Sequence, residues 1–218
     1  MAGKSNYKPT AYPCQTAKTM LYLALGLITT AFAIWLTILT ARHTALSLPS
    51  GIALEKGDWI FRGGTSADSK FIRYLSKSDY SHIGIIAETH PDILVVHATT
   101  DDDPEKPNQV LLTPLNKFLA ADKAQSYAIA RPKFLNGRQR HQTARYALSK
   151  IGRPFVLSSR DQSHYYCTIL LLDAVRSQTA SFNPKWQHLN LAVFHGDYLF
   201  PESFTRENIE WLYRVPQK

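Results

Sequence analysis

The sequence predicts an α+β domain, in which an antiparallel sheet packs against helices, preceded by one transmembrane helix at the N-terminus. The first reason is that short β-like runs and helical runs are segregated along the chain rather than strictly alternating. The second is an uncharged apolar span near the N-terminus. The third is composition. The 218 residues are 44% hydrophobic and 19% charged, which excludes a disordered chain and allows one domain with an appendage.

The uncharged span, residues 19–41, is rich in Leu, Ile, Ala and Thr. As a helix it would be about 34 Å long, enough to cross a hydrocarbon core of about 30 Å. A cleaved signal peptide is the alternative, but its apolar region is typically only about 7–15 residues long. Here the run is longer, and a basic residue, Arg42, follows it. We therefore expect an uncleaved anchor that crosses the membrane once.

The charges that flank this span predict its orientation. The first 54 residues contain four basic residues and no acidic residue, and three of the four precede the span. By the positive-inside rule, residues 1–18 are a short cytoplasmic tail. We expect a linker at 42–54 and a domain at 55–218, which lies on the outer, periplasmic side of the inner (cytoplasmic) membrane.

Six short runs of apolar and β-branched residues are predicted as strands. In chain order they are 58–62, 82–87, 93–97, 110–112, 127–130 and 209–215. The second and third runs are dense and separated by a short turn, so we expect a hairpin. The acidic loop 101–104 lacks the spacing of a calcium loop and is predicted as a solvated turn. Before the last strand, Pro201 is expected to act as a breaker.

Four segments show helical spacing or helix signals. They are 66–76, 114–119, 139–151 and 163–177. Ser66 is a suitable N-cap for the first, and Pro114 opens the second. The third ends before a Gly and a Pro. The fourth is strongly apolar, and Asp161 or Ser163 is its expected cap.

Three residues stand where apolar ones would be expected. His82 opens a buried-looking strand, His97 ends the next strand, and Cys167 lies near the start of the apolar helix. A helix N-terminus favours a thiolate, and a His that reaches such a Cys is the arrangement of papain-type hydrolases. Singly, however, a strand His is more often structural, and a lone Cys is more often a small buried hydrophobe. The only other cysteine, Cys14, lies across the expected membrane and cannot pair with Cys167.

Several short motifs occur in a recognisable order over roughly residues 55–215. They are Gly57-Asp58-Trp-Ile-Phe61, Ser78-Asp-Tyr80-Ser81-His82-Ile-Gly-Ile-Ile86, Thr113-Pro114-Leu115, Arg131-Pro132, Gly152-Arg-Pro154-Phe155, Tyr166-Cys167-Thr168 and Tyr198-Leu-Phe-Pro201. This order resembles the permuted papain-like amidases, which are circularly permuted NlpC-type cysteine peptidase relatives and include YiiX-like and YebB-like proteins. The His precedes the Cys here, as the permutation requires.

The resemblance implies a nucleophile at Cys167, a general base at His82 and an orienting residue at His97. Tyr166 or Tyr165 is then expected to line the site. Family members commonly carry a Glu where this chain has Ile169, and the segment 156–160 lacks the family's aromatic residues. Both departures bear on which substrate class the resemblance implies, and neither changes the Cys–His pair.

The resemblance leaves several functions open. One is a membrane-anchored cysteine hydrolase that cleaves an amide or ester bond, with cell-wall peptides as natural targets. A second is an acyltransferase or lipid hydrolase of the lecithin:retinol acyltransferase type, and a third is an inactive binding module. The expected substrate is therefore peptide or lipid-like. No cofactor is expected, and no metal is expected because the spacing of His82, His90 and His97 matches no zinc-ligand pattern. Nucleic acid is not expected either, because the basic residues of 131–145 are more simply explained as a solvated helix face.

Overall fold

The computed structural model describes residues 28–30, 46–191 and 193–214, and the chain divides into two units, Met1–His43 and Thr44–Lys218. In the first unit residues 28–30 are helical, and the rest of the expected anchor at 19–41 lies outside the described residues. Among the described residues, no helix is both long enough and apolar enough to span a bilayer.

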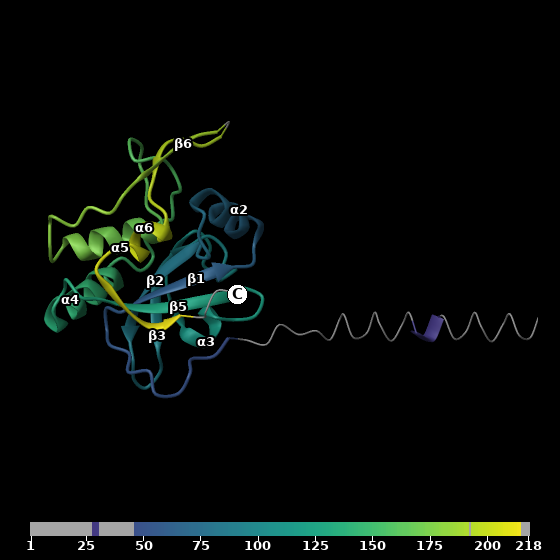
Figure 1. Cartoon of the computed structure of the whole chain (residues 1–218), viewed down its shortest axis with the longest axis horizontal. Coiled ribbons are helices and arrows are strands. Elements are labelled where there is room, and N and C mark those ends of the chain that lie inside the picture. The colour runs from purple at the N-terminus through teal and green to yellow at the C-terminus, as the bar shows by residue number, and fades with distance from the viewer. Residues whose placement is uncertain (1–27, 31–45, 192, 215–218) are drawn as a thin grey trace, which may run out of the picture. The chain divides into compact units, whose positions relative to one another are not determined.

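The second unit is built on a six-stranded antiparallel sheet with the order β4-β3-β2-β1-β5-β8 (Figure 1). The strands are β1 (Trp59–Gly64), β2 (His82–Glu88), β3 (Leu94–Thr99), β4 (Gln109–Pro114), β5 (Ala124–Pro132) and β8 (Ile209–Arg214). Each of the six expected strands is present, and most extend a few residues beyond the expected range. The expected hairpin is the β2–β3 pair.

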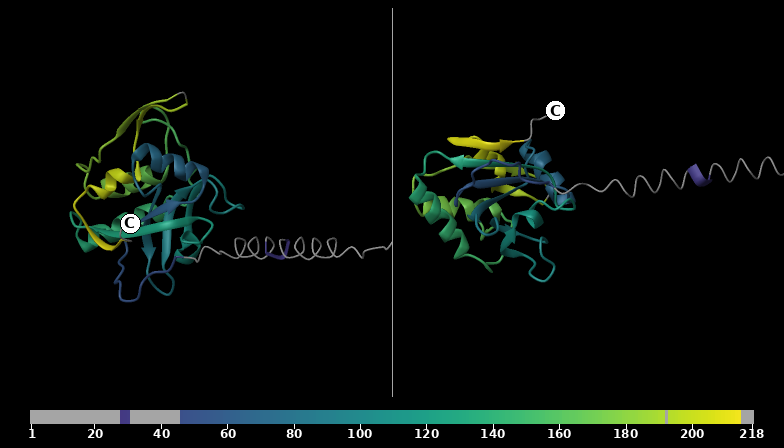
Figure 2. Two further views of the ribbon diagram at one scale, coloured as in Figure 1. Left: turned by 45° about the vertical axis from the view of Figure 1, so that its right-hand side comes forward. Right: turned by 90° about the horizontal axis from the view of Figure 1, so that it is seen from below.

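Alternate residues of the strands face two separate apolar cores. Trp59, Ile83 and Ile85 face the larger core, which they share with α4 (Gly137–Leu148) and α5 (Cys167–Arg176). Ile60 and Ile86 face the smaller core, beneath α3 (Leu115–Phe118). Figure 2 shows α4 and α5 together on one side of the sheet. The expected α+β arrangement of an antiparallel sheet against helices is therefore confirmed.

Two of the helix starts follow from local capping chemistry. In α2 (Ala67–Ser76), the Ser66 side chain accepts a hydrogen bond from the backbone N–H of Ser69 at 3.1 Å, as expected for an N-cap. In α4, Asn136 and Gln139 form a reciprocal capping box. These side chains satisfy N–H groups that have no acceptor within the helix.

Near the C-terminal end, two expectations were wrong and one pair of strands was not expected. The last long helix, α5, starts at Cys167 rather than at residue 163, because Tyr165 forms a β-bridge with Val156. Pro201 does not break the chain but begins a short helix, α6 (Pro201–Thr205), a position that Pro favours. Finally, β6 (Gln187–Asn190) and β7 (His195–Tyr198) form an unexpected hairpin that projects beyond the sheet on the side of α2 (Figure 1).

Candidate active site

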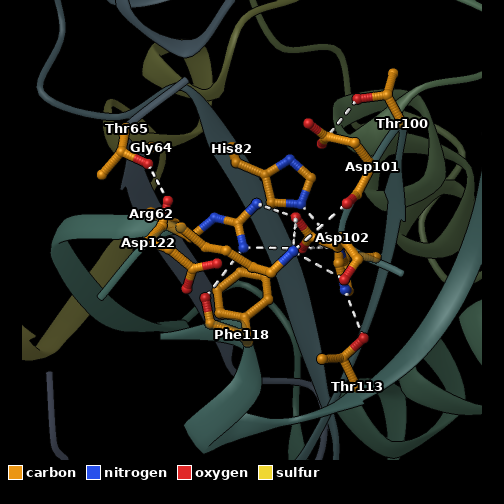
Figure 3. A network of polar contacts seen from close by, with 12 residues as sticks. Arg62, Gly64, Thr65, His82, Thr100, Asp101, Asp102, Thr113, Phe118 and Asp122 are labelled. Atoms are coloured by element: carbon orange, nitrogen blue, oxygen red, sulfur yellow. Dashed lines mark hydrogen bonds and ion pairs between the residues drawn. The ribbon is translucent and has the colours of Figure 1, made fainter. Parts of the chain in front are cut away.

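Two histidines on neighbouring strands form a hydrogen-bonded pair. His82 is the first residue of β2 and His97 lies in β3, and Nε2 of His82 is 2.9 Å from Nδ1 of His97. The other ring nitrogen of His97, Nε2, is 2.9 Å from Oγ1 of Thr113 in β4. His82 borders a cleft, whereas His97 is fully buried behind it. Figure 3 shows His82 and Thr113 at the two ends of this chain of hydrogen bonds.

The close approach of these strands requires a glycine. A Cβ atom on Gly84 would lie 2.6 Å from Cγ1 of Val95 and 3.3 Å from Cβ of His97. Both distances are shorter than ordinary van der Waals contact. Gly84 thus provides the space in which the His97 side chain reaches across β2 to His82.

One proton arrangement of this chain makes His82 a base. If Nε2–H of His82 donates to Nδ1 of His97, then Nε2–H of His97 donates to the Thr113 hydroxyl. Nδ1 of His82 then carries a free lone pair that can accept a proton from the cleft. In the opposite arrangement Nδ1 of His82 carries a proton and cannot act as a base. Thr113, which accepts as well as donates, permits the productive form.

A buried ion pair lies beside the two histidines. The Arg62 guanidinium donates to both carboxylate oxygens of Asp102, at 2.8 and 3.1 Å, and to the Phe118 carbonyl oxygen at 3.0 Å. The Asp102 carboxylate is 3.7 Å from Nδ1 of His97. Only 7% of the Arg62 side chain and 5% of the Asp102 side chain are exposed. The expectation of a solvated acidic loop was therefore wrong for Asp102.

Sequence reasoning assigned no role to Arg62, Asp102 or Thr113. One signal was present, because Arg62 lies within the otherwise apolar strand β1, and a charge inside a buried strand requires a partner. The partner itself was not predictable, since Asp102 lies 40 residues further along the chain.

Burial controls the charge of the histidines. It lowers the pKa of His82 well below its ordinary value, and the nearby Arg62 charge lowers it further, while Asp102 opposes the change. Burial likewise lowers the pKa of His97 to about 3. Burial would raise the pKa of Asp102, but the charge and hydrogen bonds of Arg62 hold that pKa well below its usual range. The site therefore combines two neutral imidazoles with a charged Arg–Asp pair.

Cys167 is the first residue of α5 and is 8% exposed. Burial raises the pKa of its thiol to about 11, although backbone N–H groups of Ile83 and Thr168 act in the opposite direction. The structure therefore favours a neutral thiol and differs from the expectation that the helix N-terminus would favour the thiolate. Desolvation of the charged form outweighs the helix terminus here.

The thiol and His82 open onto one cleft of about 560 Å³. Ile83, whose N–H acts on the thiol, is the residue that follows His82. No hydrogen bond joins Cys167 to His82 within residues 46–191 and 193–214, and such contacts commonly shorten only when substrate binds. The structure thus brings the expected nucleophile and base to the same cleft, with His97 behind the base.

The residues on either side of Cys167 tie it to the C-terminal segment. The Leu199 backbone N–H donates to the Tyr166 hydroxyl at 3.0 Å. The Thr168 hydroxyl donates to the Leu199 carbonyl oxygen at 2.8 Å. Tyr166 also lines the cleft, as expected. These two bonds fix the start of α5 against the segment that follows β7.

Two other expected site residues lie elsewhere. Tyr165 does not line the cleft, because the Val156 bridge turns it under the Arg153 guanidinium, which lies 3.6 Å from its ring centre. Asp161 does not cap α5, whose N-cap is Tyr166. Its carboxylate instead accepts a hydrogen bond from Ser159 at 2.5 Å. The expectation for Asp161 assumed a helix that begins earlier than α5 does.

One cluster of possible metal ligands occurs among the described residues, formed by His82, His97 and Asp102. Their nearest donor atoms lie within 4.8 Å of one another. However, the two imidazoles bond each other, and Arg62 holds both oxygens of Asp102. A metal cation would displace these bonds and lie beside a buried guanidinium. The donor set therefore does not fit a metal ion, and His90 of the expected zinc alternative lies outside it.

No protein-family model and no curated protein matches the chain. Among solved structures, it resembles the metalloprotein YiiX from Escherichia coli O157:H7, with a TM-score of 0.60 and 20% sequence identity over 74% of this chain and 97% of YiiX. The expected resemblance to YiiX-like proteins is therefore confirmed at the level of structure, and the chain has the fold of YiiX.

Proposed function

We propose that this protein is a cysteine hydrolase that cleaves an amide or ester bond with Cys167 as nucleophile and His82 as base. The observation that carries the proposal is the shared cleft. It joins a thiol in the first turn of a helix to the outer end of the His82–His97–Thr113 chain of hydrogen bonds. This combination of nucleophile, base and orienting group supports covalent catalysis.

In the first half of the reaction, the thiol attacks the substrate carbonyl carbon while Nδ1 of His82 takes the thiol proton. The S–C bond forms, and the carbonyl oxygen becomes an oxyanion. The N–H groups of Cys167 and Thr168, in the first turn of α5, have no backbone carbonyl acceptor within the helix and are donors for that charge. The bond to the leaving group then breaks, and His82 transfers its proton to the leaving amine or alcohol.

In the second half, water attacks the thioester. His82 takes one proton from the water, the C–S bond breaks, and the proton returns to the sulfur as the carboxylic acid leaves. His97 acts as a positioning residue, because its bond to Nε2 directs Nδ1 of His82 toward the cleft. The Asp102 carboxylate, 3.7 Å from His97, favours the transient positive charge on the pair.

The related structure is described as a metalloprotein, but this chain needs no metal for the proposed reaction. Among the described residues, only His82, His97 and Asp102 could together hold an ion. The two histidines already bond each other, and Asp102 already bonds Arg62. We therefore assign His82 and His97 to proton transfer and orientation rather than to metal binding.

We also propose that residues 19–41 anchor the hydrolase in the inner membrane with the domain on the outer side. The support is the uncharged span and the excess of basic residues before it. Such a location would bring both cell-wall peptides and lipids within reach of the cleft.

The test is to trap the acyl-enzyme. The full-length chain with Cys14→Ser, which removes the second thiol, is mixed with p-nitrophenyl acetate, and released nitrophenol and the mass of each peptide are followed. We expect a burst of nitrophenol and an acetyl group on the peptide that contains Cys167. His82→Gln should slow acylation by about 10²–10⁴-fold.

The matched control is His188→Gln, since His188 is an exposed histidine of β6 that does not line the cleft. It should acylate at the parent rate. If the acetyl group appears on other residues, or if His82→Gln acylates as fast as the control, the hydrolase assignment is wrong.

A further inference from the structure

The cleft in front of Cys167 has one strongly apolar wall. Ile72 and Leu75 of α2 pack against Leu189 of β6 and against Tyr198 and Phe200. Phe71, also on α2, contacts Phe194 next to β7, with ring centres 5.7 Å apart. All of these side chains line the cleft, so its wall is built from two elements that lie outside the main sheet.

This wall is accessible rather than sealed. The Phe71 side chain is 40% exposed although it belongs to the wall. At the tip of the hairpin, Leu191 and Val193 are 39% and 80% exposed. Exposed apolar side chains therefore occur both in the cleft wall and at the end of the β6–β7 hairpin, and an apolar ligand would displace water from them.

The charged residues that line the cleft do not suit an acidic substrate. The cations among them are Arg62 and Lys123, and both contact Asp102. The other charged lining residues are Asp68, Asp101 and Asp122. A peptide that carries free carboxylates, as cell-wall stem peptides do, would meet more carboxylates than available cations. A neutral apolar chain meets no such repulsion.

We infer that the cleft binds an aliphatic acyl chain, so that the substrate is a fatty acyl ester. This inference rests on the proposed function and names the substrate class for the same site. The acyl carbonyl lies at Cys167, and the hydrocarbon chain runs along the wall between α2 and the β6–β7 hairpin. The thiol takes the acyl group, the alcohol leaves with the proton from His82, and water then releases the fatty acid.

The inference predicts a dependence on chain length. Each methylene that is buried against the wall strengthens binding, so kcat/KM should rise by about twofold to fourfold per added methylene until the wall is filled. The full-length chain with Cys14→Ser is tested with p-nitrophenyl acetate, butyrate, hexanoate and octanoate, each below the concentration at which it forms micelles. We expect octanoate to exceed acetate by at least tenfold in kcat/KM.

Two variants test whether the wall sets this preference. Ile72→Trp places a larger side chain in the space in front of the wall. Phe71→Ala removes part of the wall at a half-exposed position, where folding is least affected. Both should lower the ratio of octanoate to acetate kcat/KM by about fivefold or more. The control is Tyr74→Trp, because Tyr74 is on the same helix, is 79% exposed and does not line this cleft. It should keep the parent ratio.

The outcomes separate the inference from the proposed function. If acetate is turned over but kcat/KM stays flat or falls with chain length, or if a cell-wall stem peptide is cleaved faster than octanoate, the fatty acyl inference is overturned while the hydrolase remains. The same holds if both wall variants keep the parent ratio. If no ester and no peptide acylates Cys167, the proposed function itself has failed.

Discussion

At the scale of single residues, the candidate site shows which roles a sequence can reveal. His82, His97 and Cys167 could be found because each is a polar or reactive residue in an apolar run. The Arg62–Asp102 pair could not be assembled in the same way, because nothing local to residues 101–104 shows that a buried guanidinium lies beneath them. The charge state of Cys167 was misjudged because its burial depends on packing between distant segments.

The reactivity of Cys167 should reflect this burial. Because its pKa is raised to about 11, the thiolate fraction near neutral pH is smaller than that of a free cysteine, whose pKa is about 8.5. With Cys14→Ser, iodoacetamide should therefore alkylate Cys167 more slowly than free cysteine at pH 7, and the rate should keep rising above pH 9. A rate that levels off below pH 7 would show a thiolate–imidazolium pair instead.

The ion pair should matter for stability. Asp102→Asn leaves a buried guanidinium without its carboxylate, so the free energy of unfolding should fall by about 3–5 kcal/mol in urea titrations. Because the folded-state pKa of Asp102 is lowered, its contribution is complete above the ordinary carboxyl pKa of about 3.9 and is lost as the pH falls below it. The difference between parent and variant should therefore shrink below pH 4.

The neighbouring acid provides the control for this measurement. Asp101 is exposed, so Asp101→Asn should change the free energy of unfolding by no more than about 0.5 kcal/mol. Equal losses from the two substitutions would contradict the importance of the buried pair.

At the scale of elements, the main sheet could be predicted and the hairpin that covers the cleft could not. The six sheet strands contain dense apolar runs, which give a clear β signal. In contrast, β6 and β7 are four-residue strands that contain mainly Gln, His, Asn, Asp and Gly, and contacts with distant segments such as α2 help to hold them in place. The start of α5 was misplaced because polar residues before it resembled a cap.

The close packing of β2 against β3 leaves no room for a side chain at Gly84, and this can be tested. Gly84→Ala would place a methyl group 2.6 Å from Val95, so the strands must separate and the bond between His82 and His97 must lengthen. We expect unfolding to become easier by about 1–3 kcal/mol, with a loss of acylation rate at Cys167. Gly137→Ala is the control, because its nearest neighbour would be 3.8 Å away, and both measurements should stay near parent values.

At the scale of the whole molecule, the sequence predicted how the domain is organised but not what the cleft prefers. The order of motifs indicated a YiiX-like fold, and the structure resembles YiiX although the two sequences are only 20% identical. The apolar wall was not predictable, since it is made of side chains from α2 and an unforeseen hairpin. The membrane anchor at 19–41 stays a prediction, because most of it lies outside the described residues.

The expected anchor and orientation can be checked with reporter fusions. Alkaline phosphatase fused after Lys218 should be active in bacterial cells, because it folds only outside the cytoplasm, and a green fluorescent protein fusion at the same place should be dark. The protein should stay in the membrane fraction after a carbonate wash. A variant that lacks residues 1–44 should become extractable. A bright fluorescent fusion would reverse the orientation.

The two hydrogen bonds that join Leu199 to Tyr166 and to Thr168 also bear on the order in which the site can be assembled during synthesis. The histidine pair, Arg62, Asp102 and Thr113 all leave the ribosome before residue 114 and can pair as soon as their strands form. Cys167 cannot be fixed so early, because the residues beside it, Tyr166 and Thr168, bond Leu199, which is synthesised 32 positions after Cys167. The part of the site that holds the two histidines can therefore form before the segment that positions Cys167 has been synthesised.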